Sequence, residues 1–110
     1  MPDTKGWPSV QVLKIARSDG VLSLSGEIDL SVAEDVRAAL VDASDAGIRV
    51  IDVSEVTFID SMGVRTLLMA ARSLNGSGPL VLRDPSDSVR RVLDIMMPNG
   101  VPELEVEASA

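Results

Sequence analysis

The chain has 110 residues, of which 17 are acidic and 10 are basic, and it contains neither histidine nor cysteine. A chain of this length suits one domain with a modest core, and the net charge of −7 argues against direct nucleic-acid binding. The two missing residue types exclude a Ser-His-Asp nucleophile, imidazole-ligated zinc, thiolate metal sites and disulfides.

The N-terminal residues lack the apolar region of a signal peptide, and no apolar run approaches the length of about 18 residues that a transmembrane helix requires. We therefore expect a cytoplasmic protein without membrane insertion. Residues 1–8 contain two prolines and one glycine and are expected to be a flexible lead-in. The single domain then spans residues 1–110, with a core of about 9–106.

Two strand-like segments, 10–15 and 21–25, flank the sequence Ser18-Asp19-Gly20. Asp-Gly between two such segments is typical of a tight turn. The sequence therefore predicts an antiparallel hairpin at the start of the domain.

A first helix is expected after residue 30. Ser31 and Glu34 have the spacing of a capping box, in which each side chain accepts a hydrogen bond from a free backbone N–H at the helix start. Gly47 stands where a left-handed residue would end this helix. The nearly continuous apolar run from 48 to 53 that follows is typical of a strand covered on both faces.

A second helix is predicted over about 61–75, and its sequence has two stripes at helical spacing. The stripe expected to be buried consists of Val64, Leu67, Leu68, Ala71 and Leu74. The opposite stripe consists of Met62, Thr66, Met69 and Ser73, flanked by Arg65. Two methionines therefore fall on the face that should meet solvent, where either a partner or a terminal segment would cover them. Adaptable methionine surfaces are common at binding sites, which favours the partner.

Residues 80–83 predict a further strand, and 104–107 alternate like a short edge strand. Between them, residues 85–88 open a third helix, whose expected buried stripe is Val89, Val92, Leu93 and Met96. This order predicts an α/β fold with a mixed sheet of about five strands, an antiparallel hairpin followed by parallel strands, packed with three to four helices. Asp29, Ser54, Asp60 and Ser61 are expected in loops at the carboxyl ends of strands, where ligands of such sheets usually gather.

Two segments of the chain resemble the STAS domain of bacterial anti-sigma factor antagonists. They are Gly26-Glu27-Ile28-Asp29 and Asp60-Ser61-Met62-Gly63, in the order and at the spacing of that family, and the resemblance extends over about residues 9–106. It implies that Ser61 is phosphorylated by a partner that is both an anti-sigma factor and a serine kinase. The unphosphorylated antagonist would capture this partner and free a sigma factor, and a phosphatase would reset the switch. The family is non-enzymatic and uses no cofactor.

The same resemblance places Asp29 beside the phosphorylation site, in a surface that faces the partner. The residues predicted to form this surface are Asp29, Asp60, Met62, Gly63, Arg65, Thr66 and Met69. Met62 stands where many relatives carry a second Ser or Thr, so Ser61 is the only hydroxyl of its tetrapeptide. Residues 96–101 also depart from the usual family ending.

Other interpretations of these residues stay open at the level of sequence. Ser61 or Asp60 would also suit a helix N-cap, Asp29 a solvated loop acid, and Gly63 a close approach either of a partner or of a neighbouring strand. The alternative function is a STAS scaffold or sensor subunit of a transporter or stress-signalling assembly. A hydrolase built on Ser61 would depend on carboxylates, which activate serine poorly at neutral pH.

Overall fold

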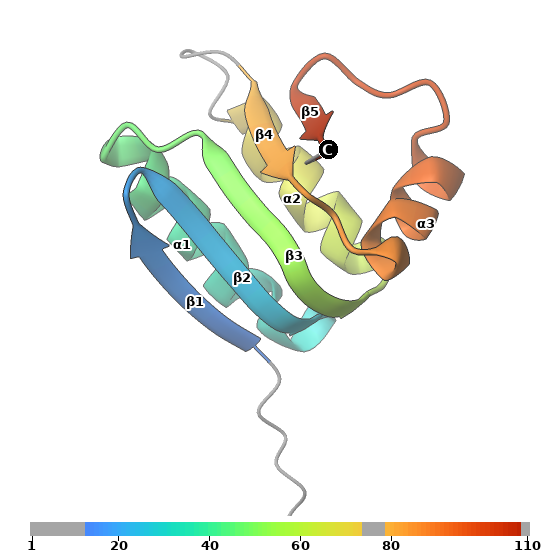
Figure 1. The fold of residues 1–110 in the computed structure, drawn as a ribbon, viewed down its shortest axis with the longest axis horizontal. Coiled ribbons are helices and arrows are strands. Elements are labelled where there is room, and N and C mark those ends of the chain that lie inside the picture. Colours follow the sequence, from blue (N-terminus) through green and yellow to red (C-terminus); the bar gives the residue numbers. More distant parts are fainter. Residues whose placement is uncertain (1–12, 74–78, 109–110) are drawn as a thin grey trace, which may run out of the picture.

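The computed structural model describes residues 13–73 and 79–108, so the predicted lead-in, residues 10–12 and Leu74 lie outside the described residues. One mixed sheet has the strand order β1-β2-β3-β4-β5, in which only the β1–β2 pair is antiparallel (Figure 1). The strands are β1 (Leu13–Ser18), β2 (Val21–Ile28), β3 (Val50–Ile59), β4 (Leu80–Arg83) and β5 (Leu104–Glu107). The helices are α1 (Ala33–Asp45), α2 (Ser61–Ser73) and α3 (Asp87–Met96), and a 3-10 turn, η1 (Leu30–Val32), precedes α1. The predicted fold class is confirmed.

The hairpin turn between β1 and β2 is built as its residue types predict. Asp19 and Gly20 both have positive φ, 53° and 79°, as a two-residue turn requires if it is to follow the twist of the strands. The two strands are in register from the Ser18–Val21 pair to the Leu13–Gly26 pair.

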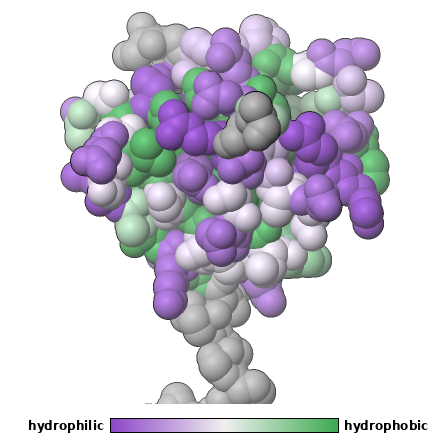
Figure 2. Space-filling view, in the orientation of Figure 1, coloured by the Kyte–Doolittle hydropathy of each residue, from purple (hydrophilic) through white to green (hydrophobic). Residues whose placement is uncertain are grey.

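The core lies between the sheet and a single layer of helices. Figure 1 shows α1 and α2 behind the sheet, and α3 contacts β3 and α2. Ile51 and Val53 of β3 are buried on this side, whereas Asp52 and Ser54, which alternate with them, are only half-buried. The prediction that residues 48–53 form a strand covered on both faces was therefore wrong. Figure 2 shows hydrophilic and weakly polar side chains across the open face.

Ser54 does not lie at a strand end, contrary to expectation. β3 continues to Ile59 because its pairing with β2 is interrupted and then restored by register shifts, which carry both strands on to the Ile28–Ile59 pair. The Ser54 hydroxyl and backbone N–H both donate to the Asp52 carboxylate, at 2.7 and 2.9 Å. Ser54 therefore belongs to the open face and not to the predicted site.

The start of the first helix also differs from the prediction. Asp29, and not Ser31, caps the chain here, because its carboxylate accepts hydrogen bonds from the Ser31 backbone and hydroxyl. Glu34 pairs with Arg37 instead of bonding back to residue 31, so the predicted capping box is absent. Gly47 does end the helix in the left-handed region, with φ of 83°.

The third helix begins as predicted and ends differently. The Ser86 side chain accepts from the Val89 backbone N–H and donates to the Val56 carbonyl at 2.6 Å, which fixes the start of α3 on β3. Val89 and Leu93 are buried and Val92 is half-buried, whereas Met96 is 41% exposed. The assignment of Met96 to the buried stripe was therefore wrong.

Candidate functional site

The two sequence motifs meet at the carboxyl ends of β2 and β3. Ile28 and Ile59 are register partners, and the backbone N–H of Asp60 donates to the Ile28 carbonyl at 3.2 Å. Asp29 and Asp60 each follow directly after these partners. The sheet therefore brings together, at the edge where ligands of parallel sheets gather, residues that are 31 positions apart in the sequence.

Asp60 forms the N-terminal cap of α2. Its carboxylate accepts from the Gly63 backbone N–H at 2.8 Å, and its carbonyl accepts from the Val64 N–H at 3.1 Å. Ser61 is the first residue of the helix and is exposed, and its hydroxyl makes no hydrogen bond to any residue in the described ranges. Of the two residues that suited a cap, Asp60 has that role, and the Ser61 hydroxyl has no structural task within that part of the chain.

Gly63 lies against the sheet. A Cβ atom at this position would lie 2.7 Å from Cγ1 of Ile59 and 2.8 Å from the carbonyl oxygen of Ile28. Both distances are shorter than any real contact of a Cβ atom, so only glycine fits. The close approach that the sequence left open is thus made by the neighbouring strands, and it holds the first turn of α2 tightly on β2 and β3.

The two stripes of α2 face mainly as predicted. Val64, Leu67 and Ala71 are buried, whereas Met62 and Met69 are 40% and 55% exposed. Arg65 is exposed beside them. Leu68, which was assigned to the buried stripe, is only half-buried, and Ala70, which was not assigned to it, is buried. The Thr66 hydroxyl donates to the Met62 carbonyl at 2.9 Å, so it bonds to the preceding turn of the same helix.

The outer face of α2 borders a groove on each side. The groove toward α3 has a volume of about 440 Å³. Its lining includes Ser61, Met62, Arg65, Met69, Met96 and Met97. A smaller groove of about 300 Å³ separates α2 from α1 and includes Thr66, Met69, Glu34 and Arg37. Met69 lines both grooves, so it lies on the ridge between them.

Met96 and Met97 were not predicted as part of the site. The sequence feature that could have indicated their role is their position at the end of α3, in a segment that departs from the family pattern. Together with Met62 and Met69 they give the α2–α3 groove four flexible apolar side chains. Such side chains adapt to the shape of a bound protein surface.

Charge is divided across this end of the molecule. The carboxylates of Asp29 and Asp60 lie at the strand ends, whereas Arg65 and Arg72 line the α2–α3 groove. On the α1 side, a hydrogen bond from Arg37 and, secondarily, its charge hold the pKa of the Glu34 carboxyl below its ordinary value. The site therefore offers both signs of charge around an apolar centre.

Two further observations bear on the chemistry. Within residues 13–73 and 79–108, no group of three or more carboxylates is placed to hold a metal ion. No helix in the same ranges is long and apolar enough to cross a membrane. The exposed serine, the flanking acids and the methionine grooves form a surface suited to protein binding.

A family model described as "Mlab, STAS domain" matches residues 12–103. No match was found among curated proteins. Among solved structures, an anti-sigma factor antagonist from Mycobacterium paratuberculosis has a TM-score of 0.68 and 24% identity, over 86% of this chain and 84% of that one.

Two forms of a second antagonist are also similar in structure. Unphosphorylated SpoIIAA has a TM-score of 0.64 and 25% identity, over 89% of this chain and 90% of that one. Phosphorylated SpoIIAA from Bacillus has a TM-score of 0.57 and 23% identity, over 89% of this chain and 93% of that one. The family model covers most of the chain, and the fold is that of these structures. The chain belongs to the STAS domain family.

Proposed function

We propose that this protein is an anti-sigma factor antagonist, non-enzymatic and cytoplasmic, whose capture of an anti-sigma factor ends when Ser61 is phosphorylated. The observation that carries the proposal is the division of labour at the start of α2, where Asp60 caps the helix and the exposed Ser61 hydroxyl has no partner in the described ranges. A kinase can therefore modify Ser61 without first breaking a structural hydrogen bond. Its similarity to SpoIIAA, known in both forms, supports this assignment.

Phosphorylation would act through charge. A phosphoryl group adds about 1.5 to 2 negative charges, and on Ser61 these would lie beside the Asp60 carboxylate and at the strand end that holds Asp29. The helix N-terminus tolerates this charge because its free N–H groups and dipole favour anions. A partner packed over Met62 and the groove behind it would have to bury the new charge or leave.

The required energy is small. A tenfold change in affinity corresponds to roughly 1.4 kcal/mol, and one hydrogen bond to a charged group contributes about 1.5–3 kcal/mol. Loss of two such contacts would release a partner held at micromolar strength. We therefore expect the predicted surface, Asp29, Asp60, Met62, Gly63, Arg65, Thr66 and Met69, to bind through the exposed side chains around Ser61, with Gly63 acting by placing the helix.

The test uses a pull-down from the native cytoplasm with three forms of the chain: unmodified, Ser61→Ala and Ser61→Asp. The first two should capture an anti-sigma factor, and Ser61→Asp should capture at least tenfold less. The captured protein should then transfer phosphate from ATP to the unmodified chain and to Ser18→Ala, which removes an exposed hydroxyl in the β1–β2 hairpin away from the predicted surface, but not to Ser61→Ala. Phosphate transfer to Ser61→Ala, or equal capture by all three forms, would contradict the proposal. A phosphatase that removes the phosphate should restore capture.

A second candidate function is favoured by the matching family model, whose description names Mlab and not an antagonist. In this alternative the chain is a scaffold or sensor subunit of a transporter or stress-signalling assembly, and Ser61 is silent. The same pull-down separates the two, because a scaffold would retain its partner in Ser61→Asp and the partner would have no kinase activity.

A further inference from the structure

We propose that the two edges of the sheet bind each other between copies of this chain, so that β5 of one copy pairs with β1 of the next. Both edges carry exposed backbone, since β1 and β5 are the outer strands of the sheet. Val101 bridges to Leu104 at the start of β5, but within residues 14–18 and 105–107 no other described strand pairs with the outer sides. Such edges are templates for strand addition. This proposal is independent of Ser61.

The direction of the strands fits this junction. β2 to β5 are parallel to one another and β1 is antiparallel to them. A second copy placed in the same orientation therefore presents its β1 antiparallel to β5 of the first copy, and the sheet continues across the junction. Antiparallel pairs are slightly more stable per residue than parallel ones.

An apolar side chain is exposed at each edge, on the same face of the sheet. Ile15 is the register partner of the buried Leu24, and Val106 is the register partner of the buried Leu82, so both lie on the helix-covered face. They are nevertheless 39% and 47% exposed.

The helix layer stops short of both edges. It leaves a groove of about 620 Å³ between α1 and β1, which includes Ile15, and one of about 200 Å³ between α3 and β5, which includes Val106. If Ile15 of one copy paired with Val106 of another, the two side chains would contact each other and be buried where the two grooves meet.

This register also matches charges on the open face. With Ile15 opposite Val106, Lys14 of one copy lies opposite Glu107 of the other, because neighbouring residues pair in opposite order in an antiparallel ladder. Lys14 shares the open face with its register partner Ser25, and Glu107 shares it with Arg83.

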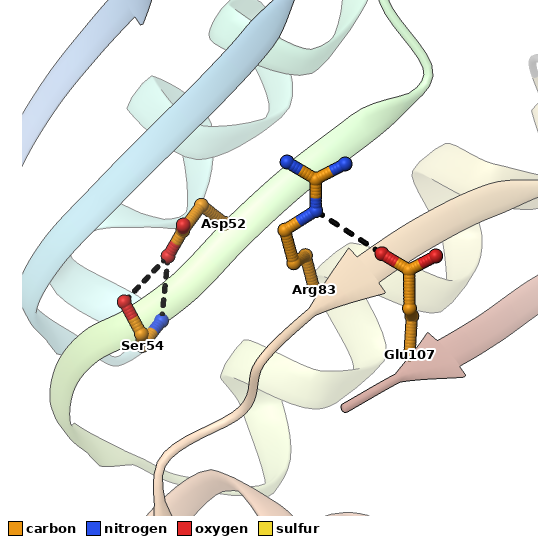
Figure 3. A network of polar contacts seen from close by, with 4 residues as sticks. All are labelled: Asp52, Ser54, Arg83 and Glu107. Atoms are coloured by element: carbon orange, nitrogen blue, oxygen red, sulfur yellow. Dashed lines mark hydrogen bonds and ion pairs between the residues drawn. The ribbon is translucent and has the colours of Figure 1, made fainter. Parts of the chain in front are cut away.

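Figure 3 shows Asp52, Arg83 and Glu107 on this face, with Glu107 accepting from Arg83 at 3.1 Å. Because Asp52 and Arg83 are also register partners, the signs alternate along the row, and Lys14 of the next copy would continue the alternation. The same argument disfavours pairing of β5 with β5, since the acidic residues Glu105 and Glu107 of one copy would then lie opposite the same acidic residues of the other.

The junction is weak and open-ended. β5 has four residues, so the pairing buries far less than the roughly 1,200 Å² of a stable interface. Each copy uses two different surfaces, and such head-to-tail contacts propagate unless the rotation closes a ring. The occupant of each edge is therefore a second copy of this chain, bound transiently and favoured by high local concentration.

The test is a dilution series of amide NMR spectra up to millimolar protein. We expect the amide signals of β1 and β5 to shift together with concentration, while those at the start of α2 stay fixed. Lys14→Glu and Glu107→Lys should each abolish the shifts when alone, because like charges then meet at the junction. An equimolar mixture of the two variants should restore them, since each edge again meets its opposite charge. Arg91→Glu, an exposed change of the same size on α3, should leave the shifts unchanged.

Three outcomes would overturn the proposal. The first is an absence of concentration-dependent shifts in the unmodified chain. The second is shifts confined to β1, which would mean that β1 pairs with β1 of another copy. The third is a mixture of the charge-reversed variants that behaves like each variant alone.

Discussion

The carboxylate of Asp60 accepts a hydrogen bond from the backbone N–H of Gly63 at 2.8 Å. This contact separates two tasks that a single serine often combines at a helix start. Asp60 stabilises the first turn of α2, and the neighbouring Ser61 hydroxyl makes no hydrogen bond within the described residues. The separation can be tested by stability measurements alone.

Asp60→Ala should lower the free energy of unfolding by about 1 kcal/mol, because it removes an N-cap. Ser61→Ala should change it by less than about 0.5 kcal/mol, since an exposed side chain without a structural bond is lost. Urea unfolding of both variants provides the comparison, and Asp60→Asn, which keeps an acceptor oxygen, is the control. A larger loss of stability from Ser61→Ala than from Asp60→Ala would show that Ser61, and not Asp60, caps α2.

Gly63→Ala should destabilise the fold by about 1–3 kcal/mol, because the new methyl group would overlap Ile59 and the backbone of Ile28. In an exposed helix the same change would stabilise by about 1 kcal/mol, so the sign of the effect is diagnostic. Thr66→Ala, one turn further along α2, serves as the control and should be nearly neutral. Thermal unfolding followed by circular dichroism measures both, and a stabilised Gly63→Ala would refute the tight contact.

Met69→Glu should weaken partner binding while leaving the melting temperature nearly unchanged, because Met69 is 55% exposed on the ridge between two grooves. Leu67→Ala, two residues away and fully buried, should instead cost about 2–5 kcal/mol of stability. Calorimetry on the two variants distinguishes surface from core. A large fall in melting temperature for Met69→Glu would show that this stripe is covered.

The Glu34 carboxyl should titrate below its ordinary pKa, and Arg37→Ala should return it to the ordinary range. A lowered folded-state pKa contributes stability above the unfolded-state pKa, and this contribution disappears as the pH falls through the folded-state value. The pair is exposed to solvent, so high salt should also raise the pKa of Glu34. Side-chain carbon chemical shifts over an acid titration measure this directly. A Glu34 pKa that ignores both Arg37→Ala and salt would exclude the ion pair in solution.

Features that depend on adjacent residues could be predicted from the sequence. The Asp19-Gly20 turn and the end of α1 at Gly47 were expected, because a positive φ is a property of single positions. The two stripes of α2 were also predicted apart from Leu68, since helical spacing decides which side chains of a helix share a face.

Features that depend on strand pairing could not be predicted in the same way. Asp29 and Ser31 are two residues apart and both can cap, and the choice was made by where β2 ends, which its pairing with the distant Ile59 decides. The length of β3, and therefore the position of Ser54 within it, depends on register shifts between β2 and β3, which the amino-acid composition does not reveal. Met96 follows the helical spacing of the core, yet it lies past the point where other elements cover α3.

The position of the candidate phosphoacceptor was predicted, whereas its surroundings were only partly predicted. The motif placed Ser61 at the start of a helix, but the sequence left two explanations for Gly63 and two candidates for the cap. The answer for Gly63 depends on Ile59 of β3 and on Ile28 of β2, which is more than 30 residues earlier in the chain, and Asp60 is held in place by a hydrogen bond to the same Ile28. Only the packed structure brings those atoms to the site.

The anchoring of Gly63 has a consequence for how fast such a switch can operate. Ser61 stands between two residues that are fastened to the sheet, Asp60 through the Ile28 carbonyl and Gly63 through its packing against Ile59. The hydroxyl therefore lies on a part of the helix that is anchored to the sheet on both sides. In the proposed switch, phosphorylation would change the charge of this surface without requiring a loop to reorganise, so the rate would be set by the kinase and the phosphatase.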